Sequence, residues 1–255
     1  MIKNNNLKLR ILSSIFLILI LLILTNINIF FFFLFSQILM FLANWESLRL
    51  LNYRKLINSG KSNLMLSRTK VSFHDFLIIL SINFFLISTF FSVFFLQILI
   101  FLLTLFLVIK AKENISLKLI TLFYISFAFF CLGEFMIDEE FFNFFFFIIF
   151  FAMSVDTSAF FTGKFFGGKK LAVTLSPNKT VSGFLGAIIL PTFGCLILFG
   201  GTENFVSIMA LSIILSLITQ TGDLIESFFK RYCYAKDSSN IIPGHGGILD
   251  RIDSI

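Results

Sequence analysis

The chain has 255 residues and a net charge of +6, and 58% of its residues are hydrophobic while 13% are charged. With a mean hydropathy of +0.98, this composition excludes a soluble globular domain and predicts an integral membrane protein with room for about eight spans. The three cysteines lie far apart and form no CxxC pair, which argues against a disulfide framework or a zinc site. The 40 phenylalanines are typical of lipid-facing filler encoded by an AT-rich genome.

Six apolar stretches predict an all-α, polytopic membrane protein of about eight helices in a single domain, residues 1–255. The stretches 11–44 and 76–109 are each 34 residues long, which suits a tight helical hairpin better than one span. The residues expected to turn these two hairpins are Thr25, Asn26 and Asn28 in the first and Ser88, Thr89 and Ser92 in the second. The other predicted spans are 117–133, 141–155, 181–199 and 205–221.

The charge distribution predicts the orientation of these spans. With eight spans, all 20 Lys and Arg residues fall on one side of the membrane, and the only charged residues in the loops on the opposite side are acidic. Because basic loops stay in the cytoplasm, both termini and the hydrophilic segments 45–75, 156–180 and 222–255 are predicted to be cytoplasmic. We therefore expect a multi-pass protein of the cell inner (plasma) membrane with its active site facing the cytoplasm. Topology and anionic lipids account for the positive charge, so no nucleic-acid partner is expected.

The segment 156–183 has a composition that favours phosphate binding. Asp156 closes a predicted span, and the glycines that follow permit close approach of the backbone. Ser176 and Thr180 offer hydroxyls at a helix entrance, where Lys179 adds a cation and free N–H groups favour an anion. A solvated basic loop would have the same composition, and no Walker A pattern occurs.

A second polar cluster continues from the last predicted span. Asp223, Glu226 and Lys230 are spaced by three and four residues, so a helix would place them on one face. A carboxylate at the membrane boundary is costly unless it has a role, which favours a function for Asp223.

The third cluster, at 236–253, combines charge with glycine. Asp250 and Asp253 would share a helix face, and hard carboxylate oxygens suit Mg²⁺. His245 in its glycine turn is interpreted as a positioning residue. Glu46 after Trp45 and His74 beside Asp75 are interpreted as interface anchors or local pairs. Together the clusters predict metal-assisted phosphoryl or nucleotidyl transfer on a membrane lipid.

The run from Ser227 to Asp253 resembles the signature of the phosphatidate cytidylyltransferases, also called CDP-diacylglycerol synthases. The 12 positions that match this signature are Ser227, Lys230, Arg231, Lys236, Asp237, Pro243, His245, Gly246, Gly247, Asp250, Arg251 and Asp253. Further matches are Asp156-Thr157 through Gly163-Lys164, the run Ser176 to Thr180, Gly222-Asp223, and Trp45-Glu46.

The resemblance implies a nucleotidyltransferase that converts CTP and phosphatidic acid into CDP-diacylglycerol and pyrophosphate with Mg²⁺ as cofactor. It implies Asp223, Asp250 and Asp253 as metal ligands, with Asp223, Asp250 and Lys236 as the catalytic residues. The attacking lipid phosphate is already anionic, so no strong general base is required. The implied substrate-binding residues are Asp156, Ser176, Lys179, Thr180, Ser227, Lys230, Arg231, His245, Gly246, Gly247 and Arg251.

Two departures from the family pattern leave alternatives open. Val181-Ser182-Gly183 stands where the family usually has an acidic residue. Family members also continue into another apolar span where this chain stops at Ile255, so a missing final helix is expected unless the spans are counted differently. The alternatives are a related CTP-dependent polyprenol kinase and a truncated, inactive remnant of the family. A transporter is disfavoured because no charged residue lies mid-span, and a homodimer stays open.

Overall fold

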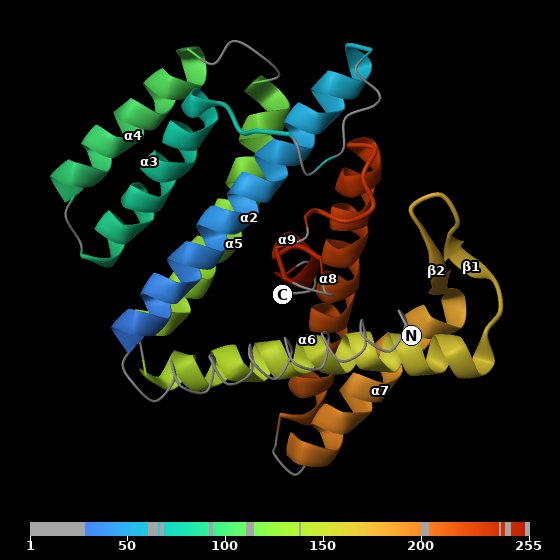
Figure 1. Ribbon diagram of the computed structural model, residues 1–255. Helices are drawn as coiled ribbons and strands as arrows, with labels where there is room; N and C mark the ends of the chain where they lie inside the picture. The colour runs from blue at the N-terminus through green and yellow to red at the C-terminus, as the bar shows by residue number, and fades with distance from the viewer. Residues whose placement is uncertain are drawn as a thin grey trace. The chain divides into compact units, whose positions relative to one another are not determined.

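The computed structural model describes residues 29–60, 66, 69–91, 94–110, 115–137, 139–199, 204–239, 241–242 and 246–252. These residues are mostly helical, and they divide into two compact units (Figure 1). The first unit is Met1–Phe142 with Cys233–Asp250, and the second is Asn143–Tyr232 with Arg251–Ile255. The Ser227-to-Asp253 run is therefore divided between the units after Tyr232.

The first unit contains α2 (Ile29–Asn58), α3 (Phe73–Phe90), α4 (Phe94–Lys110) and α5 (Ile115–Ile137). Helix α3 packs against α4, and α2 packs against α5 and α3. The predicted hairpin at 76–109 is confirmed, because α3 ends at Phe90, α4 begins at Phe94 and the two pack together. Ser88 and Thr89, which were expected in its turn, belong to the end of α3, and Ser92 lies outside the described residues. The turn predicted for the first hairpin lies outside the described residues. Helix α2 runs well past the predicted boundary at residue 44, because the change to polar side chains there ends the apolar surface and not the helix.

A buried carboxylate joins three helices of the first unit. Asp75, which is 1% exposed, accepts a hydrogen bond of 2.7 Å from Lys118 Nζ on α5 and one of 3.4 Å from Asn52 Nδ2 on α2. Ser72 caps α3, since its Oγ accepts from the Asp75 amide at 3.2 Å. The partner of Asp75 is Lys118, which lies 43 residues further along the chain, so this carboxylate joins distant helices; the interpretation of His74 as an interface anchor or local pair stays a prediction.

The second unit contains α6 (Glu139–Phe166) from Asn143 onward, the strands β1 (Lys170–Ala172) and β2 (Ser176–Thr180), α7 (Val181–Phe199) and α8 (Phe205–Tyr232). Phe151, Val155, Ala187 and Cys195 form a buried apolar cluster in this unit. Helices α6 and α7 approach closely at Gly183. A Cβ at this position would lie 2.8 Å from the Ala159 carbonyl oxygen, so only glycine leaves room for this approach.

One predicted boundary in the second unit was wrong. The span predicted at 141–155 lies within the longer helix α6, so Asp156 and Gly163 are helical and not part of a loop. The described residues are mainly helical, as predicted, with one addition: the chain between α6 and α7 forms a two-stranded antiparallel hairpin. Helix α6 continues because its sequence has no proline, and no glycine before Gly163, to end it.

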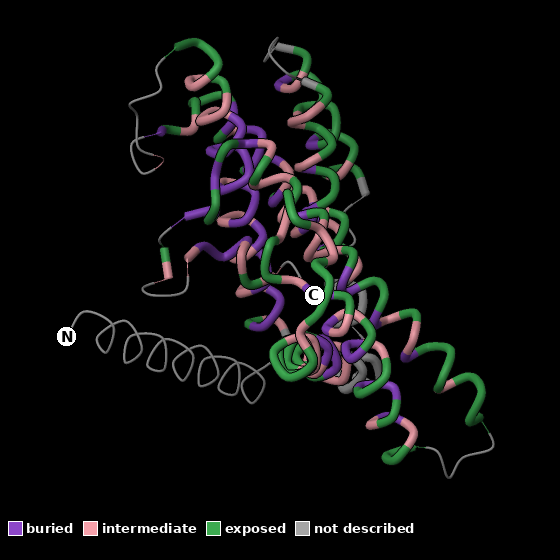
Figure 2. The backbone as a smooth tube through the Cα atoms, turned by 90° about the vertical axis from the view of Figure 1, so that its right-hand side faces the viewer, coloured by how far each residue is buried: buried purple, intermediate pink, exposed green. Residues whose placement is uncertain are grey.

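Four helices in the described part of the chain are long and apolar enough to cross a membrane: Phe30–Asn58, Phe146–Phe166, Val181–Phe199 and Phe205–Tyr232. Shorter apolar helices occur at Phe73–Thr89, Phe95–Ile109 and Ser116–Cys131. Exposed positions run along much of the helical surface (Figure 2), and they include Phe95 and Phe106, which are 79% and 60% exposed. The protein is therefore a multi-pass, mainly helical membrane protein whose exposed phenylalanines suit contact with lipid.

Candidate active site

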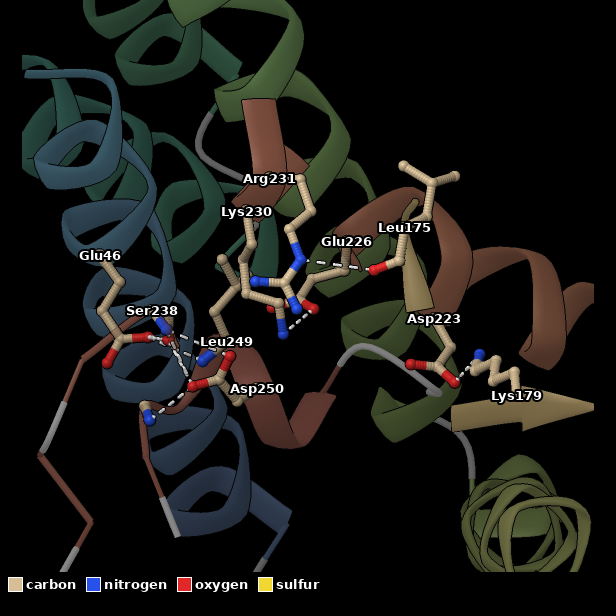
Figure 3. Close-up of polar contacts among 11 residues, drawn as sticks. Glu46, Leu175, Lys179, Asp223, Glu226, Lys230, Arg231, Ser238, Leu249 and Asp250 are labelled. Atoms are coloured by element: carbon tan, nitrogen blue, oxygen red, sulfur yellow. Dashed lines mark hydrogen bonds and ion pairs between the residues drawn. The ribbon is translucent and has the colours of Figure 1, made fainter. Parts of the chain in front are cut away.

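A buried carboxylate on α2 anchors the segment that follows Cys233. Glu46 is fully buried and accepts hydrogen bonds from both serine hydroxyls of that segment, with 2.8 Å between Ser238 Oγ and Glu46 Oε2. It also accepts from the Ile248 amide at 3.0 Å and, as Figure 3 shows, from the Leu249 amide at 2.9 Å. Since these amides begin the short helix α9 (Leu249–Ile252), Glu46 satisfies donors that would otherwise be unpaired.

Asp250 is held in the same network. Its carboxylate accepts hydrogen bonds from the Ser238 amide at 3.0 and 3.2 Å and from the Gly247 amide at 2.9 Å. Ser238 Oγ lies 3.1 Å from Asp250 Oδ2, so one hydroxyl proton is shared between Asp250 and Glu46. We call Glu46, Ser238, Ser239, Gly247 and Asp250 the Glu46 cluster. All its members belong to the first unit.

Two glycines make this network sterically possible. Gly246 has a φ of 90°, and a Cβ there would lie 2.8 Å from Asp250 Oδ2. A Cβ at Gly247 would overlap Ser238 Oγ and lie 2.5 and 2.8 Å from the Glu46 carboxylate oxygens. The amide of Ile242 donates to the Gly246 carbonyl at 2.9 Å and closes the turn. The family resemblance implied that Gly246 and Gly247 bind substrate; in this structure both glycines lie close to carboxylates of the protein.

Arg49 adds a second contact between α2 and the segment. Its Nη2 donates to the Ser238 carbonyl at 2.7 Å, and its guanidinium lies 4.6 Å from the centroid of the Trp45 ring. Sequence reasoning assigned no role to Arg49 and treated Glu46 as an interface anchor or local pair. The contact between Glu46 and Ser238 spans 192 residues, so neither local pattern could show it. The sequence feature that could have indicated this contact is the spacing of Glu46 and Arg49, an acid and a base three residues apart where the apolar part of a helix ends.

The second unit contains a different polar arrangement, which we call the Asp223 cluster and define as Lys179, Asp223, Glu226 and Lys230. Lys179 on β2 forms an ion pair with Asp223 on α8, and their side chains are 28% and 25% exposed (Figure 3). Glu226 and Lys230 pair one helical turn apart on α8, which confirms their predicted common face. The Lys179–Asp223 pair was not predicted, since Lys179 was assigned to phosphate and Asp223 to metal.

The β-hairpin positions Lys179 beside α8. Gly167 and Gly168 end α6 with φ values of 59° and 99°, a conformation that glycine adopts without strain. Strand β1 then pairs with β2, and Thr180 caps α7 by accepting from the Gly183 amide at 3.1 Å. The prediction of Thr180 at a helix entrance is confirmed, and its hydroxyl is the N-cap.

The remaining predicted site residues lie on separate elements. Asp156 is exposed on α6, Ser176 lies at the start of β2, and Ser227 is half-buried on α8. Arg231 ends α8 and donates from Nε to the Leu175 carbonyl at 3.4 Å. Lys236 is exposed after α8, and Arg251 is exposed on α9. His245 and Asp253 lie outside the described residues.

The carboxylates fit the ligand chemistry of Mg²⁺. Asp223 and Asp250 present hard oxygen atoms, and Mg²⁺ commonly uses one or two carboxylates together with waters and substrate phosphates. Within the described ranges, no group of three or more His, Cys, Asp or Glu side chains lies close enough to hold a metal ion alone. Asp223 belongs to the second unit and Asp250 to the first, and each carboxylate by itself has the oxygen ligands that Mg²⁺ uses.

The cytidylyltransferase family model matches residues 8–255. The chain belongs to the cytidylyltransferase family. Among its relatives, the phosphatidate cytidylyltransferase of Bacillus subtilis (strain 168) is 44% identical over 104 residues, which cover 40% of this chain and 39% of the relative. That of Staphylococcus aureus (strain COL) is 45% identical over 102 residues, covering 39% of each chain. That of Brucella abortus biovar 1 (strain 9-941) is 38% identical over 137 residues, covering 52% and 51%.

These matches confirm the family that the Ser227-to-Asp253 run predicted. The matched regions span about two fifths to one half of the relatives' length.

Proposed function

We propose that this protein is an enzyme that transfers the cytidylyl group of CTP to phosphatidic acid and forms CDP-diacylglycerol and pyrophosphate. The observation that supports this most is the anchored position of Asp250, which four hydrogen bonds from backbone and hydroxyl donors hold in one orientation. A carboxylate fixed in this way is preorganised for a cationic ligand such as a metal ion. The names of the relatives give the same reaction class.

The proposed step is one displacement at phosphorus. An oxygen of the phosphatidate phosphate forms a new bond to the α-phosphorus of CTP. The bond between that phosphorus and the oxygen that bridges to the β-phosphorus breaks, and pyrophosphate leaves with the bonding electron pair. Because the attacking phosphate is anionic at neutral pH, the step requires no proton abstraction, and His245 is not needed as a base.

Electrostatic stabilisation is the main task of the protein in this step. Lys236 and Lys179 are proposed to contact phosphate oxygens. Lys179 would then break its ion pair with Asp223 and pair with a substrate phosphate instead. Asp223 and Asp250 are each proposed as a Mg²⁺ ligand, followed by Asp253. Mg²⁺, when bound, supplies charge that neutralises the phosphate oxygens. The other predicted site residues are proposed to bind substrate. They are Asp156, Ser176, Thr180, Ser227, Lys230, Arg231, His245, Gly246, Gly247 and Arg251.

The distribution of Lys and Arg supports a location in the inner (plasma) membrane with these residues on the cytoplasmic side. Reporter fusions after Lys61 and after Phe199 test this orientation. A cytoplasmic reporter should be active only after Lys61, and activity only after Phe199 would overturn it.

The activity is tested with membranes that contain the full chain, CTP labelled in the α-phosphate, phosphatidic acid and Mg²⁺. We expect label in CDP-diacylglycerol, and a loss of roughly 100-fold or more in Asp223→Asn and Asp250→Asn. CTP labelled in the γ-phosphate, offered with a polyprenol, tests the kinase alternative. Label in polyprenyl phosphate, or no turnover by a wild-type chain that still binds CTP, would overturn the proposal.

A further inference from the structure

The first unit contains a pocket of about 470 Å³, a volume typical of small-molecule sites. It lies next to the Glu46 cluster, since Ser239 belongs to both and Arg49 in the pocket wall donates to the carbonyl of Ser238 in the cluster. Its wall combines two tyrosines, three aliphatic side chains, two cations, one carboxylate and one serine. The residues that line it are Arg49, Tyr53, Leu66, Tyr234, Ala235, Lys236, Asp237, Ser239 and Ile241.

Arg49 has hydrogen-bonding capacity that the protein leaves unused. The side chain is 7% exposed, and its guanidinium is fixed by the Ser238 carbonyl and the Trp45 ring. Its Nε is buried and has no hydrogen-bond partner among the described residues. A buried donor without a partner is costly, so a ligand that supplies an acceptor beside Arg49 would remove that cost.

The backbone at the pocket is also unusual. Tyr234 has a φ of 58°, and it is the one non-glycine residue with a positive φ in the described parts of the chain. This conformation reverses the chain directly after α8 and brings Tyr234 through Asp237 into the pocket wall. Strained backbone of this kind persists where surrounding contacts enforce it, and it is frequent at ligand sites. Here Arg54 lies 6.0 Å from the centroid of the Tyr234 ring.

We propose that this pocket binds the cytidine part of CTP, a proposal that rests on the proposed cytidylyl transfer. Tyr53 and Tyr234 offer flat faces for a base, because nucleobases stack on aromatic side chains. Cytosine has an exocyclic amine that donates beside ring acceptors, and a carboxylate is the usual partner of that amine. Asp237 supplies the acceptor and Arg49 supplies the donor. Lys236, the next residue along the wall, would then meet the phosphates.

This assignment also gives the protein a means to reject UTP. Uracil has a carbonyl oxygen where cytosine has the amine, so Asp237 would face an acceptor and repel it. Removal of the Asp237 carboxylate should therefore affect the choice of base more than it affects the binding of phosphate.

The test measures the equilibrium binding of CTP, UTP and pyrophosphate to the full chain in lipid nanodiscs, without phosphatidic acid so that no turnover occurs. Tyr53→Leu should weaken CTP binding about tenfold or more, as expected for the loss of one stacked aromatic ring, while Tyr53→Phe should bind like wild type. Asp237→Ala should reduce the preference for CTP over UTP about tenfold and leave pyrophosphate binding unchanged. Tyr124→Leu, an exposed position on α5 outside the pocket wall, is the matched control and should bind CTP like wild type.

The outcomes separate this inference from the proposed function. If wild type transfers cytidylyl groups and prefers CTP, but Tyr53→Leu and Asp237→Ala bind CTP unchanged, the nucleoside assignment is wrong and the activity stands. If Asp237→Ala weakens CTP and pyrophosphate equally, the pocket is a phosphate site and the assignment is also wrong. If the wild-type chain shows no preference for CTP and no transfer, the proposed function itself is wrong. Thermal unfolding of each variant shows whether it is folded.

Discussion

The Glu46 cluster and the Asp223 cluster both present carboxylates at positions expected to bind metal, but the protein holds them differently. In the first, amides and hydroxyls donate to Glu46 and Asp250, and Glu46 is fully buried. In the second, a lysine neutralises Asp223, and both side chains are about one quarter exposed. A buried network of this kind fixes geometry, whereas a partly exposed ion pair is worth little to folding and can exchange partners. The difference predicts that the Glu46 cluster contributes to both the stability of the fold and catalysis, whereas the Asp223 cluster contributes mainly to catalysis.

The largest effect is expected for Glu46→Ala, because it leaves the Ser239 hydroxyl and two amides without their acceptor and leaves the Ser238 hydroxyl with Asp250 alone. Each buried donor without a partner costs about 1–3 kcal/mol, so the free energy of unfolding should fall by roughly 3 kcal/mol or more. Transfer should fall roughly 10- to 100-fold, as for residues that orient metal ligands. Thermal unfolding in detergent and the transfer assay measure both quantities.

Ser47→Ala is the matched control for that change. Ser47 is adjacent and buried, but its Oγ donates to the Asn44 carbonyl within the same helix. It should change transfer by less than about twofold, since a hydroxyl bonded within its own helix contributes little. Equal losses in Ser47→Ala and Glu46→Ala would show that the helix, and not the Glu46 carboxylate, is what matters.

Gly247→Ala tests the steric basis of the same cluster. The added methyl group would overlap Ser238 Oγ and crowd Glu46, so Ser238 and Asp250 should lose their positions and transfer should fall about tenfold or more. Gly194→Ala, in α7, is the control, because a Cβ there meets nothing within 4 Å. Full activity of Gly247→Ala would contradict the close packing at this point.

Lys179→Met separates folding from chemistry in the Asp223 cluster. Loss of a partly exposed ion pair should change the free energy of unfolding by about 0–1 kcal/mol. Under the proposed function, transfer should nevertheless fall about 10- to 100-fold, because a cation that contacts phosphate is lost. A large loss of stability together with the activity would remove the distinction between the two clusters.

The smallest effect is expected in a thiol-labelling experiment at Cys233, the first residue of the segment that carries Ser238. Burial raises the pKa of this thiol to about 12, so almost none of it is thiolate at pH 8. In a chain with Cys131→Ser and Cys195→Ser, a maleimide should label Cys233 slowly until the protein is denatured. Glu46→Ala should accelerate labelling and Lys179→Met should not. Fast labelling of the parent chain would contradict the burial of this segment.

The sequence predicted the features that depend on local composition. The hairpin of α3 and α4 followed from a stretch too long for one span with polar residues in its middle, and the common face of Glu226 and Lys230 followed from their spacing. The cytidylyltransferase family followed from the Ser227-to-Asp253 run. These features need only neighbouring residues or a contiguous motif, which is why they could be predicted.

The features that were missed depend on contacts between distant residues. The hydrogen bonds of Glu46 and Arg49 with Ser238 join α2 to a segment almost 200 residues further along the chain, and no local sequence pattern predicts them. The β-hairpin was missed because its strands are short and polar, and its pairing depends on two left-handed glycines before it. The ion pair of Lys179 with Asp223 was missed for the same reason, because it is this hairpin that places Lys179 beside α8.

The crowding around Gly247 also limits how the gene can change. Glycine is encoded only by codons that begin with two guanines, so an AT-rich mutational drift acts against it at every such position. Where side chains face lipid, that drift can proceed, and the 40 phenylalanines are typical of its result. At residue 247 a methyl group has no room beside Ser238 and Glu46, so purifying selection should retain its two guanines while the surrounding spans drift.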